Sequence, residues 1–538
     1  IASMRKRGKS RFSRSLHFRA FEGGGVMGFA RTYSVALVGL RGHIVDVEAD
    51  ISQGLPGFVL LGLPDTALNE SKERVRSAAK NTGITLTQHR LTVNLTPATL
   101  PKRGSAFDLA IVVAALQAEK KLHPSGDSVF LGELGLDGTL RPVPGILPAV
   151  KAAVDAGHHR VIVPAENAEE AALIPGAQVS GFRCLAEVFA ALGAESQKLT
   201  YPPAPQTEAS APVATPAEIP SDMSDVAGQS QGRFALEIAA AGGHHMLLTG
   251  PPGSGKTMLA ERLPSILPTL DNDAAMEVTA IRSLCSAGEH LSELVRQPPF
   301  EAPHHSASAP AILGGGSGIP RPGCVSKAHR GVLFLDEAPE FKRTVLDSLR
   351  QPLESGTVTL DRSSASATYP ARFQLILAAN PCPCGMNVGA GTECTCAPRE
   401  RRAYFGRLSG PLVDRIDVNV TVPKVSSTEL AGGQVNESSA QIRERVMAAR
   451  QAQRERLEPY GLKTNAEMNG KILRGPLRLD AKLTGELNAA VDRGTLTARG
   501  YDRVLRIAWT LADLEGAAYP SREHLDVALF LRQQGQLK

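Results

Sequence analysis

Gly250-Pro-Pro-Gly-Ser-Gly-Lys256-Thr257 is the stretch that decides the fold of this chain's core. It matches the phosphate-binding loop pattern G-x-x-x-x-G-K-[ST] without a gap. Residues 245–249, just before it, form a short apolar run that predicts a buried strand, and the apolar residues after it recur at roughly helical spacing. Strand, loop and helix give the context that the motif needs, because backbone N–H groups and the helix N-terminus then surround a phosphate. A flexible Gly/Pro turn is the alternative for the motif taken alone.

We expect this loop to bind ATP together with Mg²⁺. Lys256 is expected to reach the β- and γ-phosphates, and the Thr257 hydroxyl is expected to hold the metal ion. The other residues of the loop would line the phosphate site: Gly250, Pro251, Pro252, Gly253, Ser254 and Gly255.

Two further apolar runs end in polar residues that suit ATP hydrolysis. Residues 332–335 end in Asp336, which suits the Mg²⁺ shell, and Glu337, which suits activation of the attacking water. Residues 373–379 end in Asn380, whose amide could orient that water, although such a residue is also a common strand cap. A strand that ends in two acids is common by chance, but beside a complete phosphate loop it predicts nucleotide hydrolysis.

Two arginines later in the chain are candidates for contact with the nucleotide. Arg415 is interpreted as an arginine finger that reaches the γ-phosphate of a neighbouring subunit. The alternative for Arg415 is a local salt bridge with Asp414 or Asp417. Arg499 lies in the first turn of a helix predicted within residues 478–536, where a second sensor arginine would contact nucleotide.

Length and composition describe an ordinary globular protein. The 538 residues suffice for roughly three or four domains of common size. Neither a signal-peptide pattern nor an apolar run near the ~18 residues of a membrane span is evident, so we expect no membrane partner. Seven cysteines in so long a chain argue against a disulfide scaffold and favour a reducing, cytoplasmic location.

The net charge of +5 is unevenly distributed along the chain. Residues 1–31 carry eight basic residues and one acidic residue, which leaves a balance of −2 for the rest. Overall basicity therefore does not indicate nucleic-acid binding by the folded body. Aromatic residues make up only 4% of the chain, so any DNA contact would use Lys, Arg and backbone N–H groups on phosphates rather than base stacking.

Shifts in composition divide the chain into five parts. Residues 1–30 are interpreted as a disordered or non-native extension, and residues 31–195 mix strand and helix patterns as an α+β domain does. Residues 196–221 are rich in Pro, Ala, Ser and Thr and indicate a linker. Residues 222–425 hold the nucleotide-binding motifs, and residues 426–538 are predicted to form a helical lid.

Two segments of the first predicted domain resemble the proteolytic domain of Lon-type proteases, which act through a Ser nucleophile and a Lys base. The nucleophile position falls on Ala106 and the lysine position on Leu147. Ser105 and Lys151 lie nearby but out of register, so we expect an inert relative and disfavour a protease. The two segments are residues 101–104 and 132–145.

The phosphate loop, the Asp-Glu strand, Asn380, Arg415 and a helical lid are together similar to the parts of an AAA+ ATPase. Five segments narrow the resemblance to the bacterial Mg-chelatase-like ATPases of the YifB/ComM group. These segments are residues 54–65, 302–305, 320–323, 380–385 and 409–417. The likeness covers about residues 31–535 and departs from the family at residues 324–327, where an acidic residue is common.

This resemblance implies an α/β fold class: an inactive N-terminal α+β Lon-protease-like domain, an AAA+ P-loop core and a C-terminal helical lid. It also implies a ring-forming homo-oligomer, a hexamer, that hydrolyses ATP. The best-characterised relatives move branched DNA during natural transformation, so we expect a DNA helicase or branch-migration motor. The alternative is a protein-remodelling motor subunit of a magnesium-chelatase-type complex, although such subunits lack the Lon-like domain.

Four cysteines are close together in the sequence as C-x-C…C-x-C. Four thiolates at tetrahedral distances would hold Zn²⁺ and stabilise a loop that has little apolar core of its own. C-x-C is less typical of zinc sites than C-x-x-C, so reduced structural cysteines remain the alternative. The residues are Cys382, Cys384, Cys394 and Cys396.

His304 and His305 precede a Gly-rich region between a predicted helix and the Asp-Glu strand. They could line a pore loop, and a hydrogen-bonded structural histidine is an equal alternative. We assign neither of them to a metal.

Overall fold

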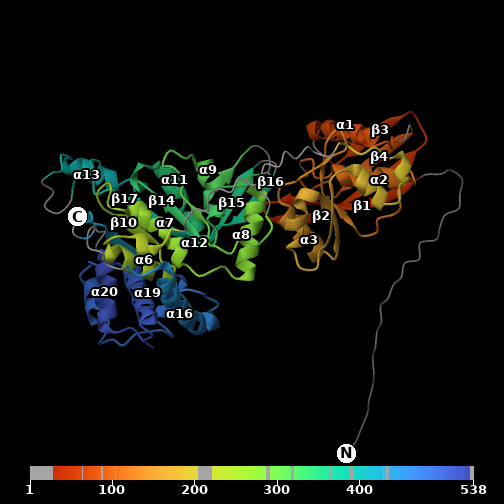
Figure 1. Ribbon diagram of the computed structural model, residues 1–538. Helices are drawn as coiled ribbons and strands as arrows, with labels where there is room; N and C mark the ends of the chain where they lie inside the picture. The colour runs from red at the N-terminus through yellow and green to blue at the C-terminus, as the bar shows by residue number, and fades with distance from the viewer. Residues whose placement is uncertain are drawn as a thin grey trace, which may run out of the picture.

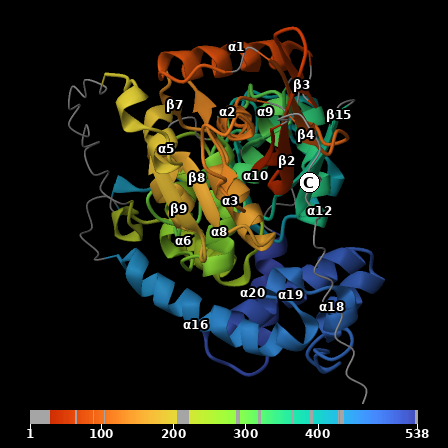
Figure 2. The same cartoon turned by 90° about the vertical axis from the view of Figure 1, so that its right-hand side faces the viewer.

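The computed structural model describes an N-terminal domain, a P-loop core and a lid domain (Figure 1). The N-terminal domain lies at one side of the P-loop core, and the lid helices lie below the core in both views (Figures 1 and 2). No helix in the described part of the chain is long and apolar enough to cross a membrane. The described residues are 28–62, 65–86, 89–102, 104–203, 221–285, 291–316, 320–362, 365–387, 393–427, 429 and 436–533.

The N-terminal domain is built on a mixed seven-stranded sheet in the order β3-β4-β2-β1-β5-β8-β9. Strands β1 and β2 form an antiparallel hairpin, β2 pairs antiparallel with β4, and the other neighbours pair in parallel. Helix α2 is apolar on every side and is buried throughout, because it packs against the sheet on one side and α1 on the other. The sheet strands are β1 (Phe29–Val38), β2 (Arg41–Ser52), β3 (Gly57–Leu61), β4 (Arg90–Thr96), β5 (Val129–Phe130), β8 (Arg160–Pro164) and β9 (Gln178–Phe182), with a small hairpin of β6 (Glu133–Leu134) and β7 (Leu140–Arg141). The helices are α1 (Asp65–Asn81), α2 (Asp108–Ala118), α3 (Ile146–Asp155), α4 (Ala168–Ala172) and α5 (Leu185–Ala191).

Both predicted ends of this domain need adjustment. Strand β1 begins at Phe29, so the predicted extension over residues 1–30 is too long by two residues; residues 1–27 lie outside the described part. At the other end, the Thr200 N–H donates to the Thr82 carbonyl (2.9 Å) and Leu199 packs against the apolar core. The start of the predicted linker therefore belongs to the domain, while residues 204–220 are outside the described part.

The P-loop core contains a parallel five-stranded sheet in the order β11-β14-β17-β10-β18. Alternate residues of its strands enter two separate apolar clusters, with Leu248 and Phe334 in one and Leu247 and Leu335 in the other. Both faces of the sheet are thus covered, which explains why the strands are apolar without alternation. The strands are β10 (Met246–Thr249), β11 (Phe300–Glu301), β14 (Val332–Leu335), β17 (Gln374–Ala379) and β18 (Val418–Thr421). The helices are α6 (Ser230–Gly242), α7 (Lys256–Ile266), α8 (Asn272–Cys285), α9 (Ala309–Leu313), α10 (Cys324–Lys327), α11 (Arg343–Ser348), α12 (Arg350–Ser355), α13 (Pro398–Phe405) and α14 (Gly410–Val413), and two hairpins pair β12 (Gly314–Gly315) with β13 (Arg321–Pro322) and β15 (Thr357–Arg362) with β16 (Ala365–Pro370).

The lid domain is helical, as the sequence predicts, but it does not have an apolar core of its own. Val446 and Trp509 of the lid belong to the same buried cluster as Leu236 and Leu259 of the P-loop core. Helix α16 packs against α6 and α7, so the lid and the nucleotide-binding helices share one interior. The lid helices are α16 (Ser439–Leu457), α17 (Gly470–Leu473), α18 (Gly485–Asp492), α19 (Ala498–Leu514) and α20 (Arg522–Gln533).

The N-terminal domain contacts the P-loop core through α3 and α8. The Gly145 N–H donates to the Ser283 carbonyl (3.0 Å), and the Leu147 N–H donates to the Ser283 hydroxyl (3.4 Å). Met276 and Ala280 of α8 pack against the apolar cluster that contains Leu147. The position of the Lon-type lysine is therefore part of the contact between the two domains.

Candidate functional site

The phosphate loop connects β10 to α7 at the carboxyl edge of the parallel sheet. Gly255 precedes the first helical residue with φ of 86°, a left-handed conformation that favours glycine. Lys256 is then the first residue of α7, so the loop lies at the N-terminus of this helix. This is the strand–loop–helix arrangement that the sequence predicts for phosphate binding.

The Lys256 ammonium is held over the loop by three oxygens. It donates to the Gly250 carbonyl (2.8 Å), the Pro251 carbonyl (2.9 Å) and the Asn380 side-chain oxygen (3.2 Å). Burial lowers the pKa of Lys256, although the carboxylates of Asp336 and Glu337 oppose this shift. The structure thus brings the phosphate-loop lysine and Asn380, two predicted site residues far apart in sequence, into direct contact.

The two predicted Mg²⁺ ligands also meet. The Thr257 hydroxyl donates to Asp336 Oδ2 (2.7 Å), which joins the start of α7 to the end of β14. Hydroxyl and carboxylate oxygens are ligands that suit Mg²⁺, so these residues fit the ion that the loop implies. Glu337, next in sequence, has φ of 49°, and its N–H donates to Asp336 Oδ1 (2.8 Å).

His305 contacts the predicted catalytic base, a relation that sequence reasoning missed. Its Nδ1 lies 3.3 Å from Glu337 Oε2. The rings of His304 and His305 are 4.1 Å apart, and His304 Nδ1 pairs with the Ser306 hydroxyl (2.8 Å). Strand order could in principle have indicated this contact. His305 follows β11, which is the parallel neighbour of β14, and the carboxyl ends of parallel strands meet at one edge of the sheet. A two-residue strand is too short to be recognised in the sequence.

Asn380 follows β17, which lies between β14 and β10 in the sheet. Its side chain therefore lies between the Asp-Glu turn and the phosphate loop, where the sequence prediction placed a water-orienting amide. The strand order explains why three apolar runs ending in polar residues converge on one place.

Arg415 is bound within its own chain. Its guanidinium pairs with Glu354 of α12 and donates to the Pro411 carbonyl. Burial lowers the pKa of Arg415, and the nearby Arg350 and Arg499 add to this effect. Among the described residues, no contact joins Arg415 to the phosphate loop or the Asp-Glu turn. The local salt bridge left open by the sequence exists, but with Glu354 rather than with Asp414 or Asp417.

Three lid arginines grip the segment that carries Arg415. Arg499 pairs with Asp414 (2.9 Å), which places this predicted sensor beside Arg415, the predicted finger. Arg503 pairs with Asp417 and donates to the Arg415 carbonyl (2.9 Å), and Arg532 donates to the Ile416 carbonyl. We refer to these contacts of residues 414–417 as the arginine grip.

Asp417 is the buried centre of the grip. Its burial favours the neutral acid, but Arg503 and the His244 hydrogen bond (3.0 Å) outweigh this and hold the pKa of Asp417 well below its usual range. The other ring nitrogen of His244 pairs with the Thr510 hydroxyl of α19 (2.8 Å). A charged Asp417 thus ties the P-loop core to the lid from inside.

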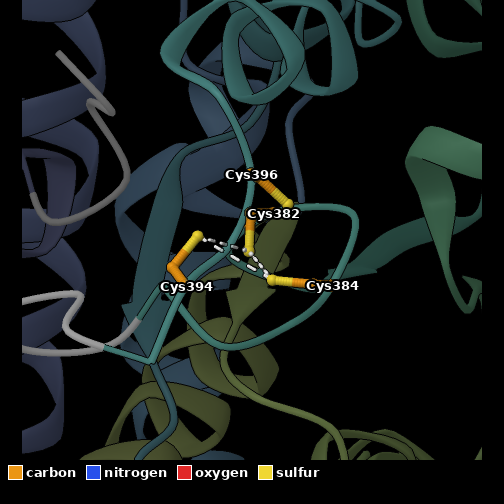
Figure 3. A group of neighbouring side chains, drawn as sticks. All are labelled: Cys382, Cys384, Cys394 and Cys396. Atoms are coloured by element: carbon orange, nitrogen blue, oxygen red, sulfur yellow. Dashed lines mark hydrogen bonds between the residues drawn. The ribbon is translucent and has the colours of Figure 1, made fainter.

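The four clustered cysteines point toward one another (Figure 3). Their Sγ atoms all lie within 4.8 Å of one another, and three of the separations are 3.3, 3.7 and 3.8 Å. A tetrahedral zinc site with Zn–S bonds of ~2.3 Å has sulfur atoms about 3.8 Å apart, so the geometry fits the predicted Zn²⁺. The residues are Cys382, Cys384, Cys394 and Cys396.

Comparison with known proteins identifies the family. Three family models match successive parts of the chain. The model described as "Subunit ChlI of Mg-chelatase" matches residues 47–167, and the one described as "Magnesium chelatase, subunit ChlI" matches residues 222–430. The model described as "Magnesium chelatase, subunit ChlI C-terminal" matches residues 436–532. YifB of Escherichia coli is 41% identical over 513 residues, 94% of this chain and 97% of YifB. Competence protein ComM of Haemophilus influenzae is 41% identical over 514 residues, 95% of this chain and 99% of ComM. The chain belongs to the YifB/ComM group of Mg-chelatase-like proteins. An uncharacterized protein of Mycobacterium tuberculosis is 48% identical over 515 residues, 95% of this chain and 99% of that protein.

A similarity of this YifB/ComM-type chain to a Lon protease is also found by comparison. Lon protease of Mycolicibacterium smegmatis is 28% identical over 139 residues, 25% of this chain. In the structure Leu147 is buried, Ser105 donates to the Glu133 carboxylate, and Lys151 pairs with Asp155 (2.8 Å). Ser105 and Lys151 are thus not paired with each other, and the loss of protease chemistry stays a prediction.

Proposed function

We propose that this chain is an ATP-hydrolysing AAA+ ring motor that acts on DNA. The observation that carries the proposal is the convergence of Lys256, the Thr257–Asp336 pair, Glu337 and Asn380 at one edge of a parallel sheet. In this proposal Lys256 binds the phosphates, Thr257 and Asp336 hold Mg²⁺, and Mg²⁺ when bound offsets charge on the phosphate oxygens.

Water activation falls to the carboxylate of Glu337 in this mechanism. It accepts the proton of the attacking water, whose position Asn380 sets through its amide. To do so, Glu337 must release the imidazole of His305, which lies 3.3 Å away. As the nucleotide enters, the Lys256 ammonium either keeps its hydrogen bond to the Asn380 side-chain oxygen or donates to a phosphate oxygen in its place.

We also propose assembly into a homo-oligomeric ring, a hexamer, as the family resemblance implies, and the placement of Arg415 supports sites that are shared between chains. Within the described residues Arg415 and Arg499 lie together and make no contact with their own phosphate loop. An arginine finger in this position completes the site of a neighbouring chain, where it neutralises charge on the γ-phosphate.

DNA is the proposed substrate because of the relative ComM, a competence protein. We therefore propose helicase or branch-migration activity in the cytoplasm, where all seven cysteines, free in this structure, stay reduced. The second candidate, a protein-remodelling subunit of a magnesium-chelatase-type complex, is favoured by the ChlI family matches.

We also propose that the four clustered cysteines bind one structural Zn²⁺.

The test is the ATPase rate with and without single-stranded, duplex and forked DNA. We expect Mg²⁺-dependent hydrolysis that DNA stimulates, and Glu337→Gln should bind ATP but hydrolyse it at least ~100-fold more slowly. Near-normal turnover by Glu337→Gln would show that another residue activates water. Hydrolysis that no DNA stimulates would favour the protein-remodelling alternative.

A further inference from the structure

The loop that carries the four cysteines packs directly on the phosphate loop. Gly385 lies against Pro252, and a Cβ added at Gly385 would be 2.5 Å from Pro252 Cδ and 2.7 Å from its Cγ. Gly385 also has φ of +78°, so both its backbone conformation and its surroundings require glycine. The turn therefore contacts one of the residues predicted to line the phosphate site.

The cysteines enclose this turn. Cys382 and Cys384 come just before Gly385, and the Gly385 N–H donates to the Cys382 carbonyl (3.0 Å). Cys394 and Cys396 bring their sulfur atoms to the same place from the returning arm. Cys382 is buried while Cys384 is exposed, so only one of the first two side chains contributes to a core. A metal ion bound by the four thiolates would fix the shape that this turn presents to the phosphate loop.

The returning arm leads to the other half of the hydrolysis site. Arg401 of α13 donates to Asn387 Oδ1 (2.9 Å), which ties the helix to the cysteine loop. Arg407, just after α13, donates to the Pro339 carbonyl (3.1 Å) and pairs with Glu340 (2.8 Å), in the turn that follows Glu337. The cysteine loop and α13 thus connect the phosphate loop to the Asp-Glu turn.

We propose that Zn²⁺ bound by the four cysteines holds this loop against Pro252 and so sets the affinity of the site for ATP. The inference rests on the proposed function in taking the phosphate loop as an ATP site. The ion is a support for the site and takes no part in hydrolysis. Loss of the ion releases the turn from Pro252 and α13 from the cysteine loop, and both sides of the nucleotide site loosen.

The first experiment measures zinc content and binding of a fluorescent ATP analogue on the same full-length protein. Wild-type protein is expected to contain about one Zn²⁺ per chain, and Cys384→Ser with Cys396→Ser to contain none. The dissociation constant for the analogue should rise at least ~10-fold in the zinc-free double variant, with an unchanged circular-dichroism spectrum. Wild-type protein without zinc and with four freely reactive thiols overturns the metal site. Zinc loss with unchanged ATP affinity overturns the coupling.

A second experiment perturbs the contact and leaves the cysteines in place. Gly385→Ala should keep its zinc and still weaken binding of the analogue, because the added Cβ displaces Pro252. Pro252→Ala combined with Gly385→Ala should recover part of this loss by removing the ring carbons. Gly461→Ala is the matched control, since Gly461 has φ of +66° but open space around its Cβ position. Equal ATP affinity of Gly385→Ala and Gly461→Ala overturns the proposal.

These binding measurements also separate the inference from the proposed function. Zinc-dependent binding of the analogue without any hydrolysis would leave the coupling standing and refute the ATPase. ATP hydrolysis by a protein whose affinity for the analogue is unchanged by zinc loss would do the reverse.

Discussion

Mixing two inactive variants, Arg415→Ala and Glu337→Gln, tests whether each ATPase site is shared between neighbouring chains. Lys256, Asp336 and Glu337 lie together in one chain, whereas Arg415 pairs with Glu354 and makes no described contact with them. If Arg415 serves the adjacent site, a chain with intact Glu337 beside a chain with intact Arg415 forms one complete site. Both variants alone should be inactive.

The size of the recovery follows from this geometry. In a ring assembled at random from equal amounts of the two variants, half of the chains retain Glu337 and half of their neighbours retain Arg415. About one quarter of the sites are then complete, so mixed rings should recover roughly a quarter of the wild-type rate if the sites act independently.

The assay is the ATP hydrolysis rate as a function of the mixing ratio, with exchange of chains verified by native mass spectrometry. Lys256→Ala mixed with Glu337→Gln is the control: both residues belong to the same half of the site, so no chain carries both and no recovery is expected. Glu354→Ala shows separately what loss of the intrachain pair with Arg415 does. Mixed rings that form but recover nothing would refute the assignment of Arg415 to the neighbouring site.

Two further predictions concern histidines of the P-loop core. His305→Ala should raise hydrolysis in the absence of DNA about 3- to 10-fold with unchanged ATP binding, because a Glu337 carboxylate without its contact to the imidazole is free to contact the attacking water. His304→Ala, which leaves the Glu337 contact intact, should not raise the rate. An unchanged rate in His305→Ala would contradict a restraining role. Desolvation lowers the pKa of His245 to about 4, and its Nδ1 accepts the Leu375 N–H (3.0 Å), so the folded state holds the neutral ring. Because this pKa lies below the unfolded value near ~6.5, the stabilisation is complete above that pH and is lost as the pH falls toward 4, by about 2 kcal/mol between pH 7.5 and pH 5. Urea unfolding at the two pH values should show this loss in wild-type protein and not in His245→Asn, whose amide oxygen still accepts the N–H; an equal loss in both would assign it to other groups.

The arrangement of much of the candidate ATP site could be predicted because its parts are local in sequence. Each part can be recognised from a few consecutive residues: a glycine loop between a strand and a helix, and apolar runs that end in Asp336 or Asn380. The order of the parallel strands then brings these parts together. The contacts of His305 and Gly385 could not be predicted in this way. The contact of His305 depends on the two-residue strand β11, which is too short to be recognised in the sequence. The contact of Gly385 depends on a close approach between two loops that no residue pattern predicts.

Domain limits were harder to predict for a related reason. The lid and the P-loop core share a single apolar cluster. The predicted boundary near residue 425 therefore separates two segments of the sequence whose buried side chains pack into the same core. For Arg415 the sequence offered a neighbouring subunit or the local acids Asp414 and Asp417 as partners, whereas the observed partner, Glu354, lies on helix α12, some sixty residues earlier in the chain. Side-chain partners set by tertiary packing leave no periodic trace in the chain.

The arginine grip has a consequence for communication around a ring. Because Arg499, Arg503 and Arg532 bind residues 414–417 from the lid, a lid that rotates would carry Arg415 with it. In the proposed ring, a nucleotide that shifts the lid of one chain would therefore change the rate at which the adjacent chain hydrolyses its own ATP. We expect ATP turnover to depend cooperatively on ATP concentration, and Arg503→Ala to flatten that dependence before it abolishes turnover. The order in which the sites of a ring hydrolyse ATP would then depend on these three guanidinium groups of the lid.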